Sequence, residues 1–151
     1  MGKNDSSQRQ EAINRYIRDD PFTAHLGAKV EIPRRGQSRV CLTVSREMAN
    51  FHGLTHGGVI FALGDIAFAA ASNSAGQTAV ALNVTINFLR ASRPGDRLVA
   101  EAREVHAGGR TAVYDIVVSN EVTGEVIARS QDLVYRKKEW FVPGDDDPGK
   151  S

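Results

Sequence analysis

The segment from His56 to Ser72 constrains the fold of this chain more than any other part of the sequence. It opens with His-Gly-Gly and continues as a helix that is apolar almost all round, interrupted by a single acid, Asp65. A surface helix has one apolar stripe and one polar face, so this helix should be surrounded by protein. A lone carboxylate there needs a partner, a raised pKa or a wet pocket, because burying it unpaired costs free energy. Since no Lys or Arg lies at helical spacing, we predict a chemical role for Asp65.

Composition narrows the class of protein. The chain has 151 residues, enough for one domain but hardly for two, and its net charge is only +1 with Lys and Arg scattered along it. Residues 1–25 are too polar for a signal peptide, and the apolar helix is too short for a membrane span. The single cysteine, Cys41, cannot pair within the chain, which fits a reducing compartment. We expect a cytoplasmic protein that binds neither nucleic acid nor a membrane.

The hydrophobic period changes along the chain from helical to alternating. It predicts a short helix over 8–18, a hairpin of 30–32 and 38–44, the central helix, and then four long strands. The strands are expected at 79–90, 97–106, 111–119 and 125–136. In the first strand one face carries Val80, Leu82, Val84, Ile86 and Phe88, and the other carries Asn83, Thr85 and Asn87.

One buried helix followed by four strands with short connections indicates an α+β fold. The expected architecture is an antiparallel sheet of five to six strands curved around the helix. Residues 1–23 are predicted to form a polar segment with a short helix, 24–138 the main domain, and 139–151 a C-terminal tail. Residues 1–7 and the tail from Gly144 are expected to lack fixed structure.

Four motifs together resemble the hotdog-fold acyl-CoA thioesterases, particularly the phenylacetic-acid-degradation branch. They are Asn-Phe-His-Gly-Leu-Thr-His-Gly-Gly at 50–58, the acid at Asp65, Asn-Val-Thr-Ile-Asn-Phe-Leu at 83–89, and Gly-Gly-Arg-Thr at 108–111. The resemblance runs from about Ala24 to Arg136 and implies hydrolysis of an aryl- or medium-chain acyl-CoA, a phenylacetyl-CoA-like substrate, to free acid and CoA. It implies no cofactor, since CoA is part of the substrate. The family's site residues match Asn50, Gly57 and Asp65 here. Some related thioesterases add a Ser or Thr on the following strand, near Ala81 or Leu82 in this chain.

Thioester hydrolysis needs a polarised carbonyl and a nucleophile delivered to it. The N-terminus of a buried helix leaves backbone N–H groups free to donate, and Gly57 has no side chain to obstruct a carbonyl. Asp65 would act as general base toward water or as a nucleophile, and the sequence leaves both routes open. Asn50 would hydrogen-bond the water or the carbonyl. His56 is a further catalytic candidate, although a role as helix cap is equally open.

The spacing of Gly57 and Asp65 predicts an oligomer. Eight helical residues span about 12 Å along a helix axis, whereas reacting atoms must come within about 3–3.5 Å. Two antiparallel helices from two subunits would bring Asp65 of one chain opposite Gly57 of the other. We therefore expect an obligate homodimer with two composite sites, as the resemblance also implies, and the family often pairs dimers into homotetramers.

Further residues are candidates for binding the substrate. The nucleotide and phosphates would meet Arg90, Arg93 and the turn Gly108-Gly109-Arg110, and the pantetheine amides would meet Asn83, Thr85 and Asn87. The acyl pocket would draw on the 51–54 loop and the central helix. Its candidate residues are His52, Phe61 and Phe68, and Gly58 is a further candidate for substrate binding.

Plainer interpretations stay open for several of these residues. Asp65 could be satisfied by backbone or a neighbouring subunit, Gly57 and Gly58 could serve tight packing, and Asn50 could be a turn residue. Two other functions are alternatives: an enoyl-CoA hydratase or dehydratase of the same fold, and a non-catalytic acyl-CoA-binding sensor. The His-Gly-Gly helix start favours the thioesterase over the former, and Asp65 argues against the latter. No His, Cys, Asp and Glu spacing suggests a zinc site.

Overall fold

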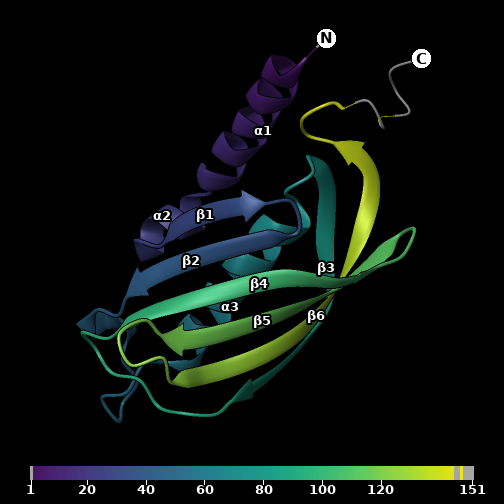
Figure 1. Cartoon of the computed structure of the whole chain (residues 1–151). Helices are drawn as coiled ribbons and strands as arrows, with labels where there is room; N and C mark the ends of the chain where they lie inside the picture. The colour runs from purple at the N-terminus through teal and green to yellow at the C-terminus, as the bar shows by residue number, and fades with distance from the viewer. Residues whose placement is uncertain (1, 145–146, 148–151) are drawn as a thin grey trace.

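A six-stranded antiparallel sheet curves around one central helix in the computed structural model, which describes residues 2–144 and 147 (Figure 1). The central helix, α3, spans Gly57–Ser72. The strands are β1 Lys29–Arg34, β2 Gln37–Thr43, β3 Gln77–Phe88, β4 Arg97–Ala107, β5 Thr111–Asn120 and β6 Val126–Trp140, and a short 3-10 helix covers Arg46–Met48. The order β1-β2-β4-β5-β6-β3 leaves β1 and β3 at the two edges. The predicted α+β class, sheet and central helix are confirmed.

Two N-terminal helices depart from the prediction. Helix α1 spans Lys3–Arg18 and so begins within the stretch expected to lack structure, where Asp5 lies in the first turn and favours the positive helix end. Helix α2, Pro21–Leu26, was not predicted. Its signal was present: Asp20 accepts a hydrogen bond from the Thr23 backbone N–H at 3.0 Å, and a proline follows at the first helical position.

The N-terminal helix packs against the end of β6. The Arg9 guanidinium donates to the backbone carbonyls of Ala75 at 2.9 Å and Pro143 at 2.8 Å. The rings of Tyr16 and Phe141 stack with their centroids 4.6 Å apart. The tail is therefore ordered as far as these contacts reach, and β6 runs beyond the predicted position 136 to Trp140. The remainder of the expected disordered tail, 145–146 and 148–151, lies outside the described residues.

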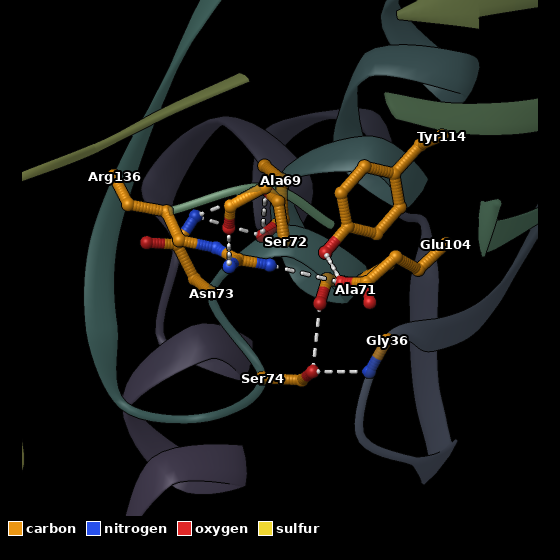
Figure 2. Close-up of polar contacts among 10 residues, drawn as sticks. Gly36, Ala69, Ala71, Ser72, Asn73, Ser74, Glu104, Tyr114 and Arg136 are labelled. Atoms are coloured by element: carbon orange, nitrogen blue, oxygen red, sulfur yellow. Dashed lines mark hydrogen bonds and ion pairs between the residues drawn. The ribbon is translucent and has the colours of Figure 1, made fainter. Parts of the chain in front are cut away.

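Polar groups hold the C-terminal end of α3 in place (Figure 2). The Ser74 hydroxyl accepts from the Gly36 backbone N–H and donates to the Ala71 carbonyl, both at 2.7 Å. The Asn73 amide donates to the Ala69 carbonyl at 2.9 Å and accepts from the Ala79 N–H at 2.9 Å. These contacts tie the helix end to the β1–β2 turn and to β3, so the position of α3 in the sheet is well determined.

The sheet covers α3 on all sides but one. Its buried residues join an aliphatic and aromatic core that includes Leu42, Leu63, Ala67, Leu98, Ile116 and Val134. A single stripe stays exposed or half-buried, running at helical spacing through Gly58, Phe61, Asp65 and Ala69. We predicted that this helix is surrounded by protein. Within one chain this holds for most of its circumference, and only the stripe is left uncovered. No helix among the described residues is long and apolar enough to cross a membrane.

An irregularity in β3 changes which of its residues share a face. The pairing with β6 shifts between Ala81 and Asn83, so Leu82 is an extra residue and is 57% exposed. The predicted single face from position 80 to 88 is therefore interrupted. Beyond the shift the alternation is as predicted: Val84 and Ile86 face α3, and Thr85 faces the opposite side of the sheet.

Candidate active site

The His-Gly-Gly motif builds the N-terminus of α3. His56 is the N-cap, with extended backbone, and its imidazole Nδ1 accepts a hydrogen bond from the Gly58 N–H at 2.8 Å. A Cβ on Gly58 would lie 2.9 Å from that nitrogen, so this cap requires glycine at position 58. His56 therefore caps α3, and its Nδ1 is already engaged by the Gly58 N–H.

Gly57 has no comparable packing requirement. A Cβ added there would meet the Phe88 ring at 3.6 Å, an ordinary van der Waals distance, and its φ is not positive. Close packing therefore does not explain this glycine. Within the described residues its backbone N–H donates no hydrogen bond, so a free donor lies at the positive end of α3.

Asp65 lies at the middle of the open stripe of α3. Burial raises the pKa of its half-buried carboxyl, and no described residue donates a hydrogen bond to it. The alternative in which its own chain satisfies this acid therefore does not describe the observed geometry. A raised pKa and a missing partner are properties of carboxylates that accept protons in catalysis.

A groove of about 690 Å³ extends from Asp65 along α3. Its walls come mainly from α1, α2, α3 and the segment after β6, and their apolar residues include Tyr16, Ile17, Phe22, Ile66, Ala69 and Phe141. The charged residues of its lining are all acids, Asp19, Asp20 and Asp65. Sequence reasoning missed the contribution of the N-terminal helices because the groove exists only once they pack beside α3.

Asn50 organises the loop that precedes α3. Its side-chain oxygen accepts from the backbone N–H groups of His52 at 2.9 Å and Leu54 at 3.2 Å, so the interpretation as a turn residue is correct. Its amide nitrogen has no acceptor among the described residues and can still donate to a substrate. His52 lies exposed at the loop tip, in ring contact with Phe51 at 4.2 Å.

The two phenylalanines predicted for the acyl pocket take different positions. Phe61 lies on the open stripe of α3 and is 40% exposed. Phe68 is 2% exposed and packs edge-on against Tyr114 in the core, with ring centroids 5.6 Å apart. Phe68 is thus a core residue because it faces the sheet, and it borders none of the grooves described here.

Candidate residues for CoA lie at opposite ends of β4. Arg90 pairs with Glu125 at 3.2 Å, and Arg93 begins the turn that leads into the strand. Gly108, Gly109 and Arg110 form the hairpin turn at its other end, where the Gly108 N–H donates to the Thr111 carbonyl at 2.8 Å. Eleven residues of β4 separate the two sets, a span of about 36 Å. One chain does not bring them together.

The polar face of β3 points away from α3. The Thr85 hydroxyl donates to the Asn83 side-chain oxygen at 3.1 Å. Thr85 borders a polar groove of about 600 Å³ on the outer surface of the sheet, together with residues such as Arg39 and Gln131. Asn83 and Thr85 are therefore not gathered with Asp65 in a single chain.

One acid near Asp65 was missed. Asp132 in β6 is 1% exposed and borders the same small cavity as Asp65. A signal was available, since Ala128, Ser130, Asp132 and Val134 alternate on the face that meets α3, and an acid there is as anomalous as Asp65 in the helix. No group of three or more His, Cys, Asp or Glu side chains among the described residues could hold a metal ion.

Known proteins are similar to this chain in sequence. Residues 52–127 match the thioesterase superfamily model. An archaeal relative from Archaeoglobus fulgidus is 39% identical over 138 residues, covering 91% of this chain and 89% of the relative. The acyl-coenzyme A thioesterase PaaI of Escherichia coli is 43% identical over 103 residues, covering 68% of this chain and 74% of that protein.

Solved structures agree with the sequence comparison. The PaaI protein of the E. coli phenylacetic acid degradation operon superposes with a TM-score of 0.81 and 36% identity, covering 87% of this chain and 95% of that one. The protein smu.793 of Streptococcus mutans, solved bound to acetyl CoA, superposes with a TM-score of 0.69 and 31% identity, covering 73% of this chain and 88% of that one. The chain therefore belongs to the thioesterase superfamily and is a hotdog-fold thioester hydrolase similar to PaaI.

Proposed function

We propose that this chain hydrolyses acyl-CoA thioesters in a composite site formed by two copies of itself. Asp65 of one copy and the Gly57 N–H of the other act on the same thioester. The observation that carries the proposal is the half-buried Asp65 carboxylate at the groove along α3, to which none of the described residues donates a hydrogen bond. The E. coli relative is named as an acyl-coenzyme A thioesterase, and the S. mutans relative binds acetyl CoA, which supports CoA esters as the substrate class.

In this scheme Asp65 takes a proton from water while the water oxygen attacks the thioester carbonyl carbon. The Gly57 N–H and the positive end of α3 stabilise the negative charge that develops on the carbonyl oxygen. When the C–S bond breaks, the CoA thiolate leaves and recovers the proton from Asp65, which yields free acid and CoA. The Asn50 amide donates to the carbonyl or orients the water. Direct attack by the Asp65 carboxylate, with an anhydride intermediate, is the second route that these residues allow.

A second copy is needed because of the shape of α3. Gly57 and Asp65 lie on one continuous helix, about 12 Å apart along its axis, so one carbonyl cannot reach both. The strand β3 lies at the edge of the sheet, and its own residues Val80, Leu82 and Phe88 are exposed. Pairing of two β3 strands about a two-fold axis would continue the sheet, cover the open stripe of α3 and set the two helices antiparallel. Association of such dimers into tetramers remains an expectation from the family.

The groove along α3 would hold the acyl group. Its volume of about 690 Å³ lies within the range of small-molecule pockets, and its apolar walls suit an aromatic or medium-length aliphatic chain. Because its charged lining residues are all acids, an acyl group that ends in a carboxylate would be repelled. The substrate class is thus a neutral aryl- or medium-chain acyl-CoA.

A thiol-release assay over a panel of acyl-CoA esters tests the proposal. Phenylacetyl-, hexanoyl- and acetyl-CoA would be incubated with the wild type, Asp65→Asn and the control Asp115→Asn. Asp115 is a half-buried acid on the outer sheet surface, paired with Arg103 at 3.5 Å. We expect thiol release by the wild type and the control, and a loss of about a hundredfold or more in Asp65→Asn.

Other outcomes would identify the alternatives. Tight acyl-CoA binding without thiol release by the wild type would indicate a sensor, and water addition to an enoyl-CoA would indicate a hydratase. Unchanged hydrolysis by Asp65→Asn would remove this residue from the mechanism while leaving the superfamily assignment intact.

A further inference from the structure

A second carboxylate lies behind Asp65, on the sheet that α3 covers. Asp132 in β6 pairs with Val84 of β3 on one side and with Tyr114 of β5 on the other, and its side chain is 1% exposed. Asp132 and Asp65 border one small cavity of about 10 Å³. This is roughly the space of a single water molecule, so little solvent lies between the two carboxylates on this side of α3.

The orientation of Asp132 is held by its own strand. The Ser130 hydroxyl, two residues earlier on the same face of β6, donates a hydrogen bond to the Asp132 carboxylate. The Ser130 hydroxyl favours the charged form of Asp132, but it carries no positive charge. The negative charge of Asp132 is therefore stabilised by a hydrogen bond and not by an opposite charge.

No cation among the described residues neutralises Asp132. Helix α3 carries no charged residue besides Asp65, and β3 carries none at all. On β5 the neighbouring group is Tyr114, whose hydroxyl donates to Glu104 of β4 at 2.7 Å (Figure 2). The Arg136 guanidinium of β6 is engaged by that same glutamate at 3.1 Å. Arg129 also borders the cavity, but its side chain is exposed on the other side of β6.

The titration of Asp132 reflects these surroundings. Burial raises the pKa of Asp132 to about 6, the Ser130 hydrogen bond lowers it, and the negative charge of Asp65 raises it. The influence is mutual, because a charged Asp132 disfavours the charged form of Asp65 by the same Coulomb energy. Asp132 becomes neutral below about pH 6, so its negative charge acts on Asp65 only above that pH.

We propose that Asp132 is a positioning residue for the thioesterase reaction, whose negative charge behind Asp65 makes Asp65 a stronger base toward water. The proposal rests on the general-base role of Asp65 described above. Asp132 does not touch the substrate and takes no proton from it; it acts through the field at the Asp65 carboxylate. A stronger base accelerates removal of the water proton, so Asp132 affects kcat and leaves KM unchanged.

The pH dependence of kcat/KM separates this role from a structural one. Wild type, Asp132→Asn and the control Asp115→Asn would be compared from about pH 4.5 to about pH 8.5. We expect the wild type and the control to show an inflection near pH 6, where Asp132 loses its charge. Asp132→Asn should lack this inflection, with a rate about three- to tenfold below wild type at pH 8 and equal to it at pH 5. Thermal melts at both pH values establish that each variant is folded.

A measurement that needs no activity closes the test. With carbon-13-labelled aspartate carboxyls, NMR titration should show that the pKa of Asp132 falls when Asp65 is replaced by asparagine. An Asp132 titration that does not respond to Asp65→Asn, or an Asp132→Asn profile that retains the wild-type inflection, overturns the proposal. If Asp65→Asn were fully active, the general-base role itself would fail, which is a distinct result.

Discussion

The imidazole of His56 accepts a hydrogen bond from the Gly58 backbone N–H at 2.8 Å, across the N-terminus of α3. This contact satisfies one orphan donor of the helix and leaves the neighbouring Gly57 N–H for a ligand. It also explains the order of the His-Gly-Gly motif, since the second glycine makes room for the imidazole. In this motif His56 therefore caps the helix, and the next residue, Gly57, offers a free N–H donor.

Replacing His56 by alanine should lower the free energy of unfolding by about 1 kcal/mol, because the cap is lost. His56→Asn, which can still accept the Gly58 N–H, should retain most of that stability. Activity should fall far less than in Asp65→Asn. Urea denaturation and thiol release measure the two effects, and a loss in His56→Asn as severe as in Asp65→Asn would restore an acid–base role to His56.

Substitutions of Gly57 should reduce turnover without unfolding the protein. A Cβ fits at 3.6 Å from Phe88, so Gly57→Ala and Gly57→Val should both fold. The added side chain would obstruct the approach of the thioester carbonyl to the Gly57 N–H. We therefore expect kcat/KM to fall about a hundredfold in Gly57→Val and by a smaller factor in Gly57→Ala. Steady-state kinetics with thermal melts checks this, and wild-type turnover by Gly57→Val would dismiss the donor role.

Mixing two inactive variants tests the composite site. In a dimer of Asp65→Asn with Gly57→Val, one site would combine the intact Asp65 of one copy with the intact Gly57 of the other. Random reassociation of equal amounts should restore about one quarter of wild-type activity, because half of the dimers are mixed and each has one intact site. Unfolding and refolding the mixture, then measuring thiol release, gives the answer. No recovery despite a sedimenting dimer would mean that both residues serve one site of the same chain.

Filling the groove beside Asp65 should change acyl selectivity. Ala69 lies on the open stripe and lines the groove, so Ala69→Phe would reduce the space next to Asp65. We expect kcat/KM to fall about tenfold or more for phenylacetyl- and hexanoyl-CoA, with a smaller loss for acetyl-CoA. Val122→Phe, at an exposed turn residue, is the matched control. An equal loss for all three esters would indicate that the acyl group lies elsewhere.

The buried acid Asp132 should make stability fall as the pH rises. Its pKa of about 6 in the folded chain lies above its ordinary value of 3.8, so the folded state binds the proton more tightly. Between these two pKa values the free energy of unfolding decreases as the pH rises. Above both values the folded protein bears the full cost of burying the charged carboxylate. The difference in free energy of unfolding between Asp132→Asn and the wild type should therefore be about 1 to 3 kcal/mol more favourable to the variant at pH 7.5 than at pH 3.5. Urea denaturation at both pH values measures it, and a difference independent of pH would contradict the shift.

Local patterns in the sequence were sufficient for the main elements. The helical period of the His56–Ser72 segment and the alternation after it predict α3 and four strands to within a few residues, because each element buries a face with its own period. The beginning of α1 and the whole of α2 were missed. Short polar segments carry no apolar period: α2 is helical because Asp20 caps it, and the first turn of α1 is favoured by Asp5 at its positive end.

By itself, the sequence determined that a lone acid would interrupt an apolar helix and that the first glycine of a His-Gly-Gly helix start would stand eight residues before it. Both facts are local, since they depend only on helical spacing and residue type. Only the tertiary structure decided that α1 and α2 wall the groove beside Asp65, and that Asp132 of β6 shares a cavity with it. These relationships join residues far apart along the chain, and sheet pairing and packing around α3 bring them together, because long-range contacts follow from the register of β3, β5 and β6.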